Sequence, residues 1–156
     1  MKEFFPGISK IRYEGVKSKK PLAFKYYDAN AKLGKKTMAE HLRFSVAFWH
    51  TMRGTGSDPF GGPAYDRPWD VAADPMQRAE DTMRAAFEFI TKLGAPFYCW
   101  HDRDIAPEAD TLKETNQRLD TIVKLAKKLQ KETGVRLLWG TSNCFSHPRF
   151  THGAGT

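Results

Sequence analysis

The sequence predicts an α/β fold with a parallel sheet. Its 156 residues are 40% hydrophobic, which suits one domain with a packed core. Three strand-like stretches alternate with two helical patterns along the chain. Strands that are joined by helices form parallel sheets through right-handed βαβ units, so this order indicates the opening of either a doubly wound fold or a (β/α)8 barrel.

Residues 1–36 are expected to form an irregular, basic extension ahead of the sheet, because glycine and proline interrupt its short apolar patches. This segment holds ten Lys and Arg against three acids, whereas residues 37–156 hold fifteen of each, so it carries the whole net charge of +7. One interpretation of such an arm is nucleic-acid binding, with Tyr26 and Tyr27 as stacking groups. No nucleic-acid motif accompanies the charge, which favours a solvated arm or an oligomer contact.

The first strand is expected at residues 42–48, where bulky side chains come at every second position. A capping-box pattern at residues 37–40 predicts a short helix just before it. Trp49 would lie at the carboxyl end of the strand. Residues 52–73 are rich in glycine and proline and lack apolar periodicity, and loops of that length are usually functional.

Two amphipathic helices are expected between the strands. The first begins at Asp74-Pro75, an N-cap followed by proline, and ends at Gly94. The second begins with a capping box at Thr111 and ends near Gly134. Each has apolar residues at three- and four-residue steps, which gives one face for packing.

The best candidate site follows the second strand. Residues 97–100 are four consecutive bulky side chains, a run typical of a strand buried on both faces. Residues 101–104, His-Asp-Arg-Asp, come directly after it, at the edge where α/β folds place ligands and catalytic groups. The alternative is that they only open a solvated loop. Residues 135–139 form the third expected strand.

Two further patterns bear on the compartment. Cys99 and Cys144 lie in apolar sequence at no metal-type spacing, so we expect reduced core residues. No apolar run approaches the roughly 20 residues that a membrane-spanning helix needs, and the N-terminus has no signal-peptide pattern. We therefore expect a cytoplasmic protein with no membrane partner.

Several of these stretches together resemble the N-terminal part of xylose isomerase, of the longer type with an N-terminal extension. The matching stretches come in the correct order and are Pro21–Phe24, His41–Thr51, Gly56–Gly61, Pro96–Asp104 and Leu137–Phe145. The resemblance covers essentially the whole chain. It implies that residues 37–156 are the first three βα units of a (β/α)8 TIM barrel, left incomplete because a whole barrel needs about 250 residues.

The resemblance also implies an activity. The family interconverts an aldose and a ketose, D-xylose and D-xylulose or glucose and fructose, and is usually a homotetramer. By position, His101 matches the histidine that contacts the sugar and assists ring opening, and Asp104 matches the aspartate that holds its imidazole. Residues three apart on a strand point to opposite faces, so the chain has to turn between these two.

Five further positions match residues that bind the substrate in the family. Trp49, Trp139, Thr141 and Phe145 match the lining of the sugar site, where flat rings exclude water. Phe60 matches an aromatic residue that reaches the site of a neighbouring subunit. The residues alone favour a plainer interpretation of Trp49, Trp139 and Phe145 as strand-end core.

Two divalent cations, Mg²⁺, Mn²⁺ or Co²⁺, serve the family, and their ligands lie beyond the equivalent of Thr156. Asp102, Asp104 and Glu108 do not replace them, because each cation needs several convergent oxygens, so we expect this chain alone to bind no metal and to be inactive. The alternatives are a non-catalytic fragment stabilised by self-association through its bare sheet edge, or, less favoured, a nucleic-acid-binding protein of barrel type.

Overall fold

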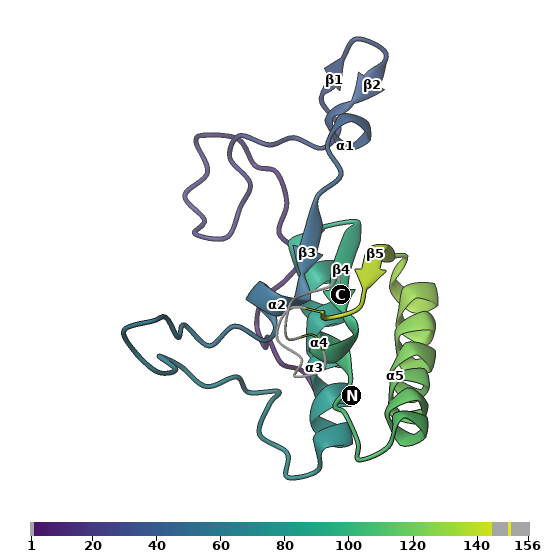
Figure 1. Ribbon diagram of the computed structural model, residues 1–156. Coiled ribbons are helices and arrows are strands. Elements are labelled where there is room, and N and C mark those ends of the chain that lie inside the picture. The colour runs from purple at the N-terminus through teal and green to yellow at the C-terminus, as the bar shows by residue number, and fades with distance from the viewer. Residues whose placement is uncertain (1, 145–149, 151–156) are drawn as a thin grey trace.

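The computed structural model describes residues 2–144 and 150, and it shows a mixed α/β arrangement around a three-stranded parallel sheet (Figure 1). The central strand β4 (Phe97–His101) lies between β3 (Ser45–Ala47) and β5 (Arg136–Thr141). The helices α3 (Pro75–Leu93) and α5 (Leu112–Thr133) connect the strands and pack against each other. The expected parallel sheet is confirmed, and in the described part of the chain its three strands do not close a barrel.

Both long helices begin and end where the sequence predicts. The Asp74 carboxylate caps α3 by accepting hydrogen bonds from the N–H groups of Met76 and Gln77, and the Thr111 hydroxyl caps α5. Each helix stops at a glycine in the left-handed region, Gly94 with φ 82° and Gly134 with φ 76°. Only glycine adopts that conformation at little cost, so these two residues determine the helix ends.

Aromatic rings on β4 form the centre of the core. Tyr98 is fully buried, and its ring lies 5.9 Å from Phe48, 5.2 Å from Phe87 and 5.1 Å from Trp100 between centroids. Its hydroxyl accepts a hydrogen bond from Gln130 Nε2 on α5. Burial raises the pKa of Tyr98, and this hydrogen bond offsets only part of the rise. The second predicted strand is therefore buried on both faces, as expected. Its last residue, His101, is the first residue of the candidate site.

The predicted first strand is wrong in its extent. β3 covers only Ser45–Ala47, and the following residues form the short helix α2 (Phe48–Thr51). Ser45 is paired with Phe97, the first residue of β4, and Gly94-Ala95-Pro96 precede that residue. Residues 42–44 consequently have no strand beside them, and the alternating pattern there lies partly in exposed chain. Trp49 comes from α2 instead of from a strand end.

The third strand is longer than predicted and contains a β-bulge. β5 reaches Thr141, and all of its residues are exposed. The register pairs Tyr98 with Leu137 but Cys99 with Trp139, so Leu138 is the extra residue. Beyond the bulge, His101 is paired with Thr141. Because side chains alternate along a strand, the bulge decides which face of the sheet Trp139 occupies.

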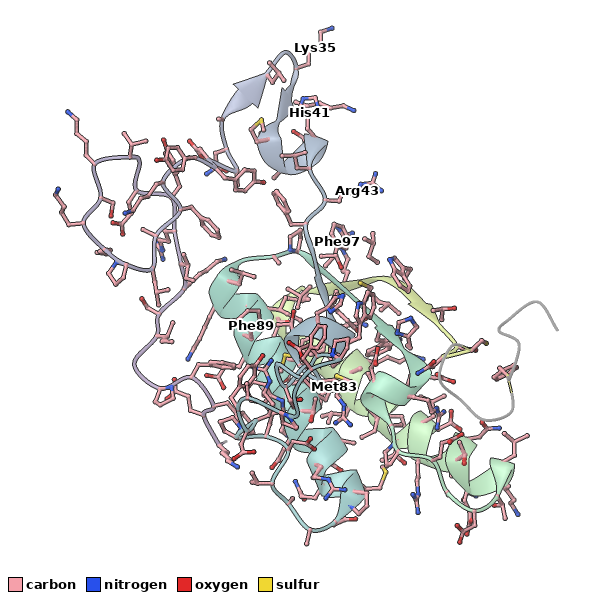
Figure 2. All side chains as sticks on the ribbon, turned by 60° about the vertical axis from the view of Figure 1, so that its left-hand side comes forward. Lys35, His41, Arg43, Met83, Phe89 and Phe97 are labelled. Carbon is pink, nitrogen blue, oxygen red and sulfur yellow. The ribbon has the colours of Figure 1, made fainter. Side chains whose placement is uncertain are left out.

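Part of the N-terminal extension is regular, which the sequence did not predict. The strands β1 (Lys32–Leu33) and β2 (Lys36–Thr37) form an antiparallel hairpin, followed by the short helix α1 (Met38–His41). The predicted capping box of Thr37 and Glu40 is present at its start. Figure 2 shows Lys35 and His41 on this unit, which projects away from the body of the molecule.

The first residues are fastened to α3 by one carboxylate. Glu88 accepts hydrogen bonds from the backbone N–H of Phe4 at 2.8 Å and of Phe5 at 3.0 Å. The ammonium of Lys92 lies 2.7 Å from the same side chain and 2.8 Å from Glu3. Burial alone would raise the pKa of Glu88, but hydrogen bonds from Lys92 and the two N–H groups outweigh it and lower that pKa.

We expect Glu88→Gln to lower the free energy of unfolding at pH 7 by about 1.5–3 kcal/mol, the range of a hydrogen bond to a charged group. Because the folded pKa of Glu88 is lowered, its contribution is present above the ordinary value of 4.5 and is lost as the pH falls through the folded pKa. Urea unfolding at neutral and at acidic pH measures both effects. The difference between wild type and variant should disappear in acid.

The exposed i,i+4 pair of Lys128 and Glu132 gives the control, since its atoms are 3.9 Å apart and largely in water. Such pairs contribute little, so Glu132→Gln should leave the unfolding curve unchanged. Equal stability of Glu88→Gln and wild type at pH 7 would contradict the anchoring role of Glu88.

Candidate active site at the carboxyl end of the sheet

The chain turns immediately after β4, and this turn brings His101 to Asp104. The short helix α4 (Asp102–Ile105) begins directly after His101. Asp104 Oδ2 accepts a hydrogen bond from the His101 backbone N–H at 2.7 Å and lies 3.0 Å from His101 Nδ1. The two side chains are only 13% and 11% exposed. The hydrogen-bonded pair expected from the sequence is therefore present.

This contact determines where the imidazole carries its proton. An ionised carboxylate can only accept hydrogen bonds, so we assign Nδ1 of His101 as the donor to Asp104. In the neutral ring the lone pair then lies on Nε2. A ring held in one tautomer and one orientation is suited to general acid–base chemistry.

Two tryptophans lie against this imidazole. The ring of Trp49, from α2, is 4.7 Å from the His101 ring between centroids, and the ring of Trp139, from β5, is 6.1 Å from it. The two indoles are 5.3 Å apart. Trp139 remains 44% exposed, and Thr141 is the sheet partner of His101. Four of the predicted site residues thus gather around His101 at one end of the sheet. They are Asp104, Trp49, Trp139 and Thr141.

Of the other two predicted positions, Phe60 is not part of this group. Phe60 is 98% exposed on a turn in which Asp58 Oδ1 accepts a hydrogen bond from the Phe60 N–H at 2.7 Å. Its ring therefore extends into solvent. Phe145 lies outside the described residues.

Asp102 is a site residue whose role sequence reasoning missed. The sequence suggests no role for it beyond a metal ligand set that it cannot complete, but its Oδ1 accepts a backbone hydrogen bond from Asn143 at 2.8 Å. That bond joins the turn after β4 to the segment after β5. The only sequence signal for Asp102 is that an acidic residue is favoured at the first position of a helix. This signal does not predict a hydrogen bond to a residue 41 positions away.

The residues that the structure describes do not fit a centre for divalent cations. Across residues 2–144 and 150, no group of three or more His, Cys, Asp or Glu side chains is placed to hold a metal ion. The oxygens nearest the site are also engaged, Asp104 Oδ2 by His101 and Asp102 Oδ1 by backbone N–H groups. In the same part of the chain, no helix has the length and apolar character to cross a membrane.

The basic extension offers less to nucleic acid than its sequence indicated. Tyr27 packs edge-on against Phe24 and Phe44, with centroids 6.3 Å and 5.0 Å away. The ammonium of Lys20 lies 2.6 Å from Glu14. Of the two tyrosines, only Tyr26 is exposed enough to stack on a base.

The fold and the site define a class: an α/β protein with an imidazole–carboxylate pair and aromatic rings at the carboxyl end of a parallel sheet, the edge where α/β folds place ligands and catalytic groups. No family model matches the sequence. Along nearly its whole length, however, the chain is similar to xylose isomerases, which confirms its resemblance to an N-terminal portion of that enzyme.

Three relatives show the extent of this similarity. The chain is 56% identical over 155 residues to xylose isomerase of Xanthomonas oryzae pv. oryzae (strain MAFF 311018) and to xylose isomerase 1 of Xanthomonas axonopodis pv. citri (strain 306). It is 57% identical over 155 residues to xylose isomerase 2 of Xanthomonas campestris pv. campestris (strain 8004). Each match covers 99% of this chain but 35% of the relative, so the chain spans about a third of the length of these proteins.

Proposed function

We propose that the chain is the N-terminal part of an aldose–ketose isomerase of the xylose isomerase type, which converts D-xylose to D-xylulose. Its parallel strands would be the first three of a (β/α)8 barrel. The observation that supports this most directly is the His101 ring, held by Asp104 and enclosed by Trp49 and Trp139. The identity of 56% to xylose isomerases over nearly the whole chain supports it independently.

In this proposal His101 assists the opening of the sugar ring. Asp104 keeps the proton on Nδ1, so Nε2 is the nitrogen that takes part in proton transfer with a sugar hydroxyl. Trp49 and Trp139 present flat apolar faces to the C–H groups of the sugar and exclude water. Thr141 supplies a hydroxyl that both donates and accepts hydrogen bonds. Phe145 would complete the wall.

Divalent cations belong to this proposal only through the remainder of a full-length isomerase. Such ions polarise sugar oxygens as Lewis acids, and the described residues provide no cluster to hold them. What this chain contributes is the positioned imidazole, its carboxylate and the aromatic wall.

Self-association is a second proposal, and the exposed third strand favours it. Leu137, Leu138 and Trp139 are 37–44% exposed on β5. Among the described residues, β3 and β5 each pair with β4 alone. Bare edges and apolar strand faces are usually covered in proteins. Further barrel strands or other copies of the chain would cover them, and the exposed Phe60 ring suits a contact with a neighbouring subunit of a homo-oligomer.

The test is xylulose formation from xylose. We expect the purified 156-residue chain to form none, with or without added Mg²⁺ or Co²⁺, because its described residues include the proposed ring-opening pair but no cluster for the cations that polarise the sugar oxygens. In a full-length xylose isomerase that carries these residues, His101→Ala should lower kcat by about 10²-fold to 10⁴-fold, the typical contribution of a general acid–base group.

His41 is the matched control, since it is an exposed histidine on α1, far along the chain from the site. His41→Ala should leave kcat unchanged. Metal-dependent turnover by the 156-residue chain that His101→Ala abolishes would contradict the expectation that this chain alone is inactive. An unchanged kcat in the full-length His101→Ala enzyme would remove the catalytic role of His101.

A further inference from the structure

Asp102 connects the ends of two neighbouring strands. Its Oδ1 accepts hydrogen bonds from the backbone N–H of Asn143 at 2.8 Å and from that of Arg103 at 2.8 Å. The bond to Asn143 spans 41 residues of sequence. Asp102 directly follows His101, and Asn143 follows the last residue of β5, Thr141, by two positions. The two segments that this carboxylate joins are therefore the two that carry the imidazole and Trp139.

β5 is paired with β4 up to Thr141, and the Asn143 bond adds a connection beyond the last of these pairs. All of its residues are exposed, and its register to β4 shifts at Leu138. A slip of one residue along a strand turns every side chain to the opposite face. Such a slip would carry Trp139 and Thr141 away from His101. The Asn143 bond is made two residues beyond the end of β5, where it opposes this slip.

An ion pair with Arg103 is the simpler explanation of Asp102, and the geometry disfavours it. Arg103 Nη2 is 3.5 Å from Asp102 Oδ2, and the carboxylate is 29% exposed. Partly exposed pairs at such a distance contribute little. The two bonds to Oδ1 are shorter and end on backbone groups, which cannot turn away to solvent as a long side chain can.

We propose that Asp102 is a positioning residue of the candidate site: as a hydrogen-bond acceptor it fixes the register of the end of β5 and so keeps Trp139 against His101. The importance of this placement for turnover rests on the proposed function, but the placement itself does not. The negative charge is not what matters here. An asparagine at this position retains the accepting oxygen and should preserve the geometry.

The test compares Asp102→Ala and Asp102→Asn by NMR of the 156-residue chain. The ring currents of Trp49 and Trp139 displace the His101 ring-proton signals, which are assigned by their loss in His101→Gln. In Asp102→Ala we expect the part of this displacement that comes from Trp139 to be lost and the Asn143 amide to exchange with solvent much faster, while the part from Trp49 on α2 remains. Asp102→Asn should retain both wild-type signatures. Asp120→Ala, at an exposed aspartate on α5, is the matched control and should change neither.

Two results would overturn the proposal: wild-type His101 signals in Asp102→Ala, or their loss in Asp102→Asn as well. If the alanine variant does not fold, the wild-type chain still decides, because an Asn143 amide that exchanges as fast as an unprotected coil amide excludes the bond. In a full-length isomerase, Asp102→Ala should lower kcat about 10-fold to 100-fold through misplacement, and Asp102→Asn should restore it. A lost ring-proton displacement with unchanged turnover would count against the proposed function while leaving the positioning role intact.

Discussion

Alanine at position 140 is expected to lower the free energy of unfolding by about 2–3 kcal/mol, the upper range for overpacking. A Cβ on Gly140 would lie 2.5 Å from Nε1 and 2.9 Å from Cδ1 of Trp100. Trp100 cannot move aside easily, because it is buried with its ring 5.8 Å from Phe48 and 5.1 Å from Tyr98. The added methyl group therefore has to push β5 away from β4.

Urea unfolding of Gly140→Ala measures this loss. Gly62→Ala is the control, since a Cβ there meets no atom within 4 Å and φ is not in the left-handed region. It should stay within about 0.5 kcal/mol of wild type. If both variants unfold at the same urea concentration, Trp100 and β5 are not held as rigidly as their contact indicates.

Tyr98→Ala is expected to cost about 4 kcal/mol, the range for deleting a buried aromatic side chain. Tyr98 is fully buried at the centre of the core, between Phe48, Phe87 and Trp100. These neighbours come from α2, α3 and β4, so they cannot collapse together into the cavity without moving whole elements.

Tyr98→Phe separates packing from hydrogen bonding, because it removes only the hydroxyl that accepts from Gln130. We expect it to lose about 1 kcal/mol, the net value of one hydrogen bond. Both variants are compared by urea unfolding at neutral pH. A loss of similar size in the two variants would mean that the Gln130 contact, rather than ring packing, makes Tyr98 important.

The two long helices could be predicted from the sequence because local residues determine their ends. Asp74, Gly94, Thr111 and Gly134 act through caps and a positive φ, which do not depend on the rest of the fold. The strands were less predictable, since a strand exists only where a neighbour pairs with it. Residues 42–44 alternate as a strand should, but β4 starts opposite Ser45, so they remain unpaired.

The candidate site likewise combines local contacts, which the sequence predicts, with long-range contacts, which it does not. His101 and Asp104 could be predicted as a hydrogen-bonded pair because only a turn separates them. The contact of Trp49 with Trp139 depends on a short helix and a bulge at Leu138 that the residue pattern does not reveal. The Asp102–Asn143 bond is a contact over 41 residues, which a local pattern cannot show. Phe60, finally, was predicted to reach the site of a neighbouring subunit, and a single chain cannot test that contact.

The anchoring of Phe4 and Phe5 by Glu88 has a consequence for synthesis on the ribosome. Glu88, which binds the backbone of Phe4 and Phe5, is synthesised after them, because it follows Phe4 by 84 positions. At 5–20 residues per second, the ribosome needs about 4–17 s to cover that distance. Throughout this interval the two phenylalanines of the nascent chain lack their place against Trp69 and Phe89. Phe4 and Phe5 can therefore reach their native contacts only after α3 has been synthesised.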